Sequence, residues 1–261
     1  MIAAMAYVDD AEGWRRLIAS LAQWSRTIDG ASEGMRAIGR DGMVMTITPR
    51  VPRRSIVNDV VYWDRDALAA AYDDLDAAYR AAGIEAWLVW VPEADTDTAA
   101  LLADRGHVLD SDPEAMVLDL DAVERPPEPA GFSREIDPLA LARINDEAYG
   151  MHSAFARALE RLEAGDGLYF YGVEADGELL SGLVTFDHED DCSVWLVATR
   201  SAARGRGYAG ALMAHAMADA RERGRTTSTL QATDLGRPVY ERLGYRSLGE
   251  IQMWEKRTIA A

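Results

Sequence analysis

The segment Arg204–Ala209 has the residue types and spacing of an anion-binding loop. It reads Arg-Gly-Arg-Gly-Tyr-Ala and joins a predicted strand to a predicted helix. Glycines let a ligand approach the main chain, and the first N–H groups of a helix have no partner within it. Two arginines add charge-assisted donors that suit a pyrophosphate. The predicted loop consists of Arg204, Gly205, Arg206, Gly207, Tyr208 and Ala209. The alternative is a glycine turn with solvated arginines.

The same letters contain a second motif, because Gly205, Gly207 and Gly210 have the spacing of a dinucleotide-binding fingerprint. A nicotinamide-dependent oxidoreductase is therefore an alternative, with Asp234 as its candidate ribose-binding acid. Three features argue against it. A polar stretch separates the motif from the preceding strand, the motif lies late in the chain, and a predicted hairpin precedes it instead of a βαβ unit.

Together with a second block, the loop resembles the GNAT superfamily of acetyl-CoA-dependent N-acetyltransferases. The signature Arg/Gln-x-x-Gly-x-Gly/Ala is met by Arg204, Gly207 and Ala209, and the second block is Leu-Gln-Ala-Thr-Asp-Leu-Gly-Arg-Pro-Val-Tyr-Glu-Arg-Leu-Gly-Tyr at 230–245. The resemblance covers about residues 131–257. It implies two splayed strands with pantetheine between them, acetyl-CoA as cosubstrate, and an amine of a small molecule or peptide as acceptor.

The resemblance also implies roles for single residues. Tyr240 is the implied general acid, which returns a proton to the coenzyme A thiolate; the alternative is a core aromatic residue. Backbone amides of Val197, Ala198 and Thr199 are implied to bind the acetyl carbonyl as it gains charge. A non-catalytic acyl-CoA-binding protein is a further alternative, which the retained Arg204, Gly207 and Tyr240 disfavour.

The base that deprotonates the acceptor is not defined by the motifs, because residues 192–199 contain no carboxylate. The candidates are Glu147, Asp187, His188 and a chain of water molecules. His152 either lines the acceptor pocket or lies in a surface loop. The acidic stretch 187–191 is interpreted as a solvated hairpin turn, so that no metal site is expected. Trp195 is expected in the core.

The elements predicted around the motifs form a mixed α/β fold, in which a sheet of parallel and antiparallel strands has helices on its faces. In the second half they are helices at 139–149 and 153–163, a hairpin of strands at 168–174 and 179–186, a strand at 192–199, a helix at 207–223, a strand at 228–232, a helix at 237–243 and a strand at 251–255. The hairpin rests on the turn signal Asp176-Gly177. The strand before the loop and the helix after it would place the loop at the edge of this sheet.

A proline-rich connector at 124–131 divides the chain into residues 1–125 and 126–261. The first half predicts helices at 14–28, 66–82 and 96–105, and strands at 43–48, 55–62, 87–91 and 115–120. Its second helix ends at Gly83 as the helix of the other half ends at Gly224. The halves are therefore predicted to be two GNAT-like copies in tandem.

The first copy lacks the residues that bind an anion. Alignment through Gly83 and Gly224 places Asp64 at Gly205 and Asp66 at Gly207, while Leu102 takes the place of Tyr240. Carboxylates at a helix N-terminus suit the helix dipole but repel a pyrophosphate. Residues 1–125 are therefore predicted to be a degenerate half that supports the catalytic half and walls the acceptor site. The alternative is an unrelated α/β lobe.

Composition limits the partners. The chain has 261 residues, a formal net charge of −17 and a single lysine, so nucleic acid is not an expected partner. Cys192 is the only cysteine, which argues for a reducing compartment. No apolar run reaches the length of a spanning helix, so no membrane contact is expected and a cytoplasmic location is predicted. A monomer or a homodimer is expected, and the net charge favours a cationic amine as acceptor.

Overall fold

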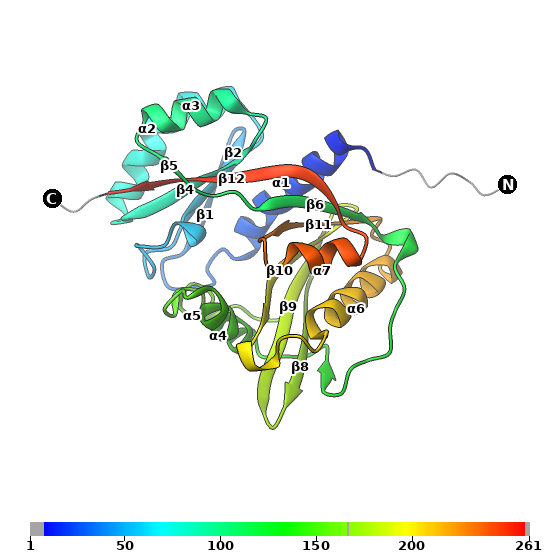
Figure 1. Ribbon diagram of the computed structural model, residues 1–261. Coiled ribbons are helices and arrows are strands. Elements are labelled where there is room, and N and C mark those ends of the chain that lie inside the picture. The colour runs from blue at the N-terminus through cyan, green and yellow to red at the C-terminus, as the bar shows by residue number, and fades with distance from the viewer. Residues whose placement is uncertain (1–7, 166, 259–261) are drawn as a thin grey trace.

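The computed structural model describes residues 8–165 and 167–258 and shows one mixed α/β sheet that runs through both halves of the chain (Figure 1). The first half contains α1 (Asp10–Thr27), β1 (Arg36–Arg40), β2 (Met43–Ile47), a 3₁₀ turn η1 (Ser55–Val57), β3 (Asp59–Tyr62), α2 (Arg65–Ala81), β4 (Ala86–Pro92), α3 (Thr96–Asp104), β5 (Val108–Ser111), β6 (Glu114–Asp119) and η2 (Leu120–Ala122). The second half contains β7 (Phe132–Ser133), α4 (Pro138–Tyr149), α5 (Ala154–Ala158), β8 (Leu168–Ala175), β9 (Glu178–His188), β10 (Asp191–Thr199), η3 (Ser201–Ala203), α6 (Tyr208–Glu222), β11 (Thr227–Ala232), α7 (Arg237–Arg242) and β12 (Arg246–Arg257). None of the described helices has the length and apolar character needed to cross a bilayer.

The two halves exchange their last strands. The sheet order is β1-β2-β3-β4-β12-β6-β11-β10-β9-β8-β7, with β5 beside β12. Strand β6 of the first half therefore pairs with β11, and β12 of the second half pairs with β4. The register of β12 shifts near Gly249, so that its first part pairs with β6 and its second part with β4. A cut at residue 125 divides the sequence but not the sheet.

Alternate residues of the second-half strands point to helices on opposite faces. Tyr171, Val173 and Leu183 lie in one core cluster with residues of α6. Phe170 and Val184 lie in another cluster with residues of α4 and α5. This two-residue period is that of a strand buried on both faces. The sheet is thus fixed from both sides around β8, β9 and β10.

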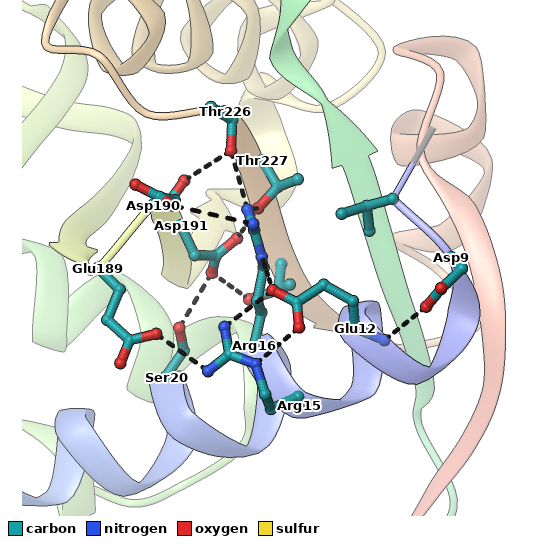
Figure 2. A network of polar contacts seen from close by, with 12 residues as sticks. Asp9, Glu12, Arg15, Arg16, Ser20, Glu189, Asp190, Asp191, Thr226 and Thr227 are labelled. Atoms are coloured by element: carbon teal, nitrogen blue, oxygen red, sulfur yellow. Dashed lines mark hydrogen bonds and ion pairs between the residues drawn. The ribbon is translucent and has the colours of Figure 1, made fainter. Parts of the chain in front are cut away.

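Helix α1 belongs to the first half but contacts strands of both halves, including β2, β3, β10 and β11. Figure 2 shows the polar contacts at this junction. The buried carboxylate of Asp191 accepts hydrogen bonds from Ser20 Oγ at 3.0 Å and from Thr227 Oγ1 at 2.8 Å. Arg16 donates to the hydroxyl oxygens of Thr226 at 2.9 Å and Thr227 at 2.8 Å. These bonds fasten the first half to the strands that carry the predicted site.

Asp191 corrects one expectation. Glu189 and Asp190 form the turn between β9 and β10, as predicted, but Asp187 and His188 belong to β9, and Asp191 is 1% exposed and is not solvated. The hairpin signal Asp176-Gly177 is confirmed, because both residues have the positive φ that such a turn requires, 52° and 77°. The β8–β9 hairpin therefore forms where the sequence placed it.

Most predicted elements are present, and the differences are local. Strands β1, β5 and β7 were not predicted, and β12 begins at Arg246, ahead of the predicted strand. The predicted strand at 55–62 is a 3₁₀ turn followed by the short β3, because Asn58 interrupts it. Its side chain accepts from the N–H of Thr48 and donates to the carbonyls of Val51 and Arg54. The predicted helix at 153–163 is limited to Ala154–Ala158.

Candidate active site

The parallel strands β10 and β11 separate partway along their length. Their register runs from Asp191 to Ser193 and stops there, although both strands continue. On the other side, the β10–β9 register jumps from Trp195 to Ala198, and Leu196 has a φ of 54°. The side-chain amide of Asn145, on α4, donates to the carbonyl of Leu196 at 2.8 Å and holds this bulge in place. The bulge re-aims the backbone at Leu196 and Val197 toward the opening between the strands.

The loop before α6 leaves the N-terminus of that helix open. Gly205 and Gly207 have φ values of 76° and 79°, a left-handed conformation that glycine adopts without the cost of a β-carbon. A β-carbon built at either glycine would meet no described atom within 4 Å. Gly207 is the N-cap of α6 and supplies no side-chain hydrogen bond. Free helix amides and the positive end of the helix dipole therefore face the space beside the loop.

A cavity of about 600 Å³ lies against this loop and helix end. All nine residues predicted to bind the coenzyme line it: Val197, Ala198, Thr199, Arg204, Gly205, Arg206, Gly207, Tyr208 and Ala209. We call it the coenzyme cavity. Sequence reasoning did not assign the lining residues Tyr149, Gln231, Thr233, Leu235, Val239 and Arg242. Most of them lie in the block 230–245, in which the motif indicates a role for Tyr240 alone.

Tyr240 lies on α7, is 7% exposed and lines the coenzyme cavity. A β-carbon at Gly236 would come within 2.9 Å of its ring, so a glycine is needed there to seat the phenol. Burial, with a smaller effect of Tyr149, raises the pKa of Tyr240 above its ordinary value. The phenol therefore keeps its proton at neutral pH, as a proton donor must.

A second cavity, of about 510 Å³, lies between the two halves. We call it the inter-half cavity. The first half contributes the end of α1, residues 54–59 and Trp90, and the second half contributes α4, α5, residues 194–197 and Tyr240. Tyr149, Val197, Gln231, Thr233 and Tyr240 line both cavities. The two cavities therefore adjoin at the splayed strands.

The predicted acceptor-side residues lie outside both cavities. Glu147 is exposed and pairs with Arg200 at 2.8 Å. Asp187 makes two 2.8 Å bonds to Arg223. His152 is exposed in the loop between α4 and α5. Their predicted roles gain no support from these positions.

Trp195 requires a correction as well. It is half-buried, stacks on Trp24 of the first half at 4.6 Å, and lines the inter-half cavity. The sequence placed it in the core, and Trp195 does pack against two core clusters, but its exposed part lines the inter-half cavity.

The model of the acetyltransferase (GNAT) family matches residues 126–245. Among solved structures, a GCN5-related N-acetyltransferase from Kribbella flavida is similar, with 17% identity, a TM-score of 0.68 and coverage of 94% of this chain and 95% of that one. A GCN5-related N-acetyltransferase from Sphaerobacter thermophilus has 18% identity, a TM-score of 0.59 and coverage of 96% and 94%. A tandem GNAT protein from the clavulanic acid biosynthesis pathway, whose structure is described as without AcCoA, has 17% identity, a TM-score of 0.59 and coverage of 84% and 79%. None of the curated proteins matches this chain.

The chain therefore carries a domain of the GNAT acetyltransferase family at residues 126–245, and the protein is an acyltransferase. The predicted mixed α/β fold of the GNAT type is confirmed. The dinucleotide-binding interpretation gains no support, because the antiparallel β9–β10 hairpin and the turn η3 precede the glycine motif.

Proposed function

We propose that this protein transfers the acetyl group of acetyl-CoA to a primary amine of a small molecule or peptide held in the inter-half cavity. The observation that carries the proposal is the position of Tyr240, which lines the coenzyme cavity and the inter-half cavity at once. A proton donor for the reaction has to lie where the thioester and the amine meet. Tyr240 lies at that boundary.

The loop before α6 supports binding of the coenzyme pyrophosphate. Its glycines present main-chain amides without side chains above them, and Arg204 and Arg206 add positive charge. Arg242, exposed at the same cavity, is a third cation near the bound phosphates. Tyr149 and Leu235 are exposed large side chains on this cavity, which suits them to cover the apolar parts of the coenzyme.

The residues of the chain divide the chemistry between them. Backbone amides at Val197, Ala198 and Thr199 stabilise the acetyl oxygen as it gains negative charge. The amine nitrogen forms its bond to the acetyl carbon, and the carbon–sulfur bond breaks. Tyr240 gives its proton to the departing sulfur and recovers one from the nitrogen. The other proton that the acceptor ammonium loses goes to solvent before the attack, because only the neutral amine has the lone pair that forms the new bond.

We also propose that residues 1–125 form a degenerate GNAT-like half and that residues 126–261 form the catalytic half. The exchanged strands β6 and β12 and the contacts of α1 support a structural role for the first half. Its residues 54–59 and Trp90 give it a part of the acceptor wall. The two halves then act as one enzyme with one coenzyme site.

A thiol-release assay with acetyl-CoA and a panel of primary amines tests the proposal. We expect release of coenzyme A that depends on the amine, with a matching amount of acetylated amine by mass spectrometry. Melting temperatures with acetyl-CoA and with NAD provide the control. Stabilisation by NAD and not by acetyl-CoA would contradict the proposed function.

A further inference from the structure

Charged side chains line the inter-half cavity, and they differ in whether an opposite charge lies beside them. Three carboxylates line it, Asp59, Asp110 and Glu255, together with Arg54 and Arg257. Glu255 is 3% exposed, accepts from Ser55 Oγ at 2.5 Å and is paired with Arg257, whose Nη2 lies 2.9 Å away. Asp110 is exposed. Asp59 is the carboxylate that combines depth in the protein with access to the cavity.

Asp59 lies at the start of β3 in the first half. Trp90 Nε1, on the neighbouring strand β4, donates to its Oδ2 at 2.8 Å. Burial is the main cause that raises the pKa of Asp59 to about 6, and no arginine or lysine lowers it. Among the described residues, Asp59 takes part in no ion pair within 4.0 Å. At neutral pH the cavity therefore contains an ionised carboxylate that has no ion-pair partner among the described residues.

The cavity around Asp59 is rich in aromatic rings. Trp24, Trp90 and Trp195 all line it, together with apolar residues of α5 and residues 56–57. A carboxylate in a cavity with aromatic and apolar walls favours an organic cation, because the carboxylate attracts the charge and the walls pack on the carbon chain. An aliphatic ammonium ion fits this chemistry better than a metal ion does.

Asp59, in β3, and Tyr240, in α7, line the same cavity from different halves of the chain. In the sheet order, β3 is separated from β11, the strand that precedes α7, by β4, β12 and β6. Neighbouring strands lie about 4.8 Å apart, so these four steps exceed the size of one ammonium group. A cation bound to Asp59 is therefore a different group from the amine that reacts beside Tyr240.

We propose that Asp59 determines acceptor specificity by pairing with a second cationic group of the acceptor. The enzyme then selects amines that carry two positive charges joined by an apolar chain, one acetylated beside Tyr240 and the other held by the first half. This inference rests on the proposed acetyl transfer. It assigns to the degenerate half the choice of substrate and leaves the chemistry to the second half.

The test compares linear alkyl diamines with monoamines of the same chain length at pH 7.5. For the unaltered protein we expect kcat/KM to be at least about tenfold higher for the best diamine. Asp59→Asn keeps an oxygen that accepts from Trp90 but removes the charge. This variant should lose the preference through a higher KM for diamines, with turnover of monoamines little changed. Asp112 lies between the lining residues Ser111 and Pro113 but does not itself line the cavity. Asp112→Asn is therefore the matched control, and it should keep the preference for diamines.

A binding measurement separates this proposal from the proposed function. Calorimetry with diamine and monoamine requires no turnover, and we expect the diamine to bind more tightly to the unaltered protein and not to Asp59→Asn. If no amine is acetylated but this pattern holds, the proposed function fails and the cation site stands. Equal binding and equal use of diamine and monoamine would overturn the inference, as would an equal loss for both in Asp59→Asn. Asp59→Ser provides a second neutral variant should Asp59→Asn not fold.

Discussion

Two helices of this protein, α6 and α2, begin at corresponding places in the two halves, but their N-termini are capped differently. Helix α6 follows the long loop Arg200–Arg206 and is capped by Gly207, which has no side chain. Helix α2 follows β3 after Trp63 alone and is capped by Asp64. The Asp64 carboxylate accepts from the amides of Asp66 at 3.0 Å and Ala67 at 3.1 Å.

The comparison shows that the first half binds an anion at this position already, and that the anion is its own side chain. An external phosphate would have to displace a carboxylate that is covalently part of the chain. The caps also correct the predicted alignment, because Asp64 takes the place of Gly207 and not that of Gly205. Farther along, the two halves agree again. The N–H of His107 donates to the carbonyl of Leu102 at 2.9 Å, as that of Tyr245 does to Tyr240 at 3.1 Å.

The largest expected effect is that of changing Tyr240, the residue that corresponds to Leu102 of the first half. Tyr240→Phe should lower turnover by about 10²–10⁴-fold, because it keeps the ring but removes the proton of the general acid. Affinity for acetyl-CoA should stay nearly the same. Tyr245→Phe is the matched control, since this buried phenol bonds to Ser228 at 2.7 Å and lines neither cavity. It should affect stability more than turnover. Near-normal turnover in Tyr240→Phe would show that the proton comes from elsewhere.

The next prediction concerns Gly207→Asp, which copies the capping carboxylate of the first half into the second half. Gly207→Asp should weaken acetyl-CoA binding by roughly 10²–10³-fold, because two like charges about 4 Å apart repel by a few kcal/mol near a protein surface. Gly207→Asn has the same shape without the charge, and asparagine tolerates positive φ. Calorimetry should show a much smaller loss for it. An equal loss in both variants would place the cause in the backbone and not in the charge.

A third prediction concerns the carboxylate that the first half places in the inter-half cavity. The raised pKa of Asp59, about 6, means that the folded protein binds this proton more tightly than the unfolded chain. Stability from this group is present at low pH and is lost as the pH rises through about 6. Asp59→Asn should therefore match the unaltered protein near pH 4 and exceed it by about 1–3 kcal/mol at pH 8. Urea unfolding at both pH values measures this, and a difference independent of pH would contradict the assignment.

The smallest expected effect comes from removing the N-cap of α2. Asp64→Ala should cost about 1 kcal/mol of stability, the usual value of a lost N-cap. It should create no second coenzyme site, because the short connection at Trp63 provides neither a glycine loop nor arginines. Calorimetry should therefore show one acetyl-CoA per chain in the variant and in the unaltered protein. Two sites in the variant would mean that the cap alone separates the halves.

Local patterns predicted much of the fold and the coenzyme side of the site. The turn at Asp176-Gly177, the helix after Gly207 and the strand that carries Val197 depend on residues close in sequence, and they were predicted correctly. The acceptor side was not predicted. Its walls come from segments as far apart as 54–59 and 253–257, and no local pattern shows that these segments meet.

The sequence by itself determined where a phosphate loop can form, because positive φ at Gly205 and Gly207 and the uncapped helix that follows are properties of neighbouring residues. It also determined that the first half lacks this loop. Only the tertiary structure decided that β6 and β12 exchange places and that Trp195 faces a cavity. It likewise decided that Asp59 lines the inter-half cavity without an ion-pair partner among the described residues. A strand pairs with whichever edge completes the sheet, and a carboxylate is solvated or buried according to the elements packed around it, so both outcomes depend on contacts between residues far apart in the chain.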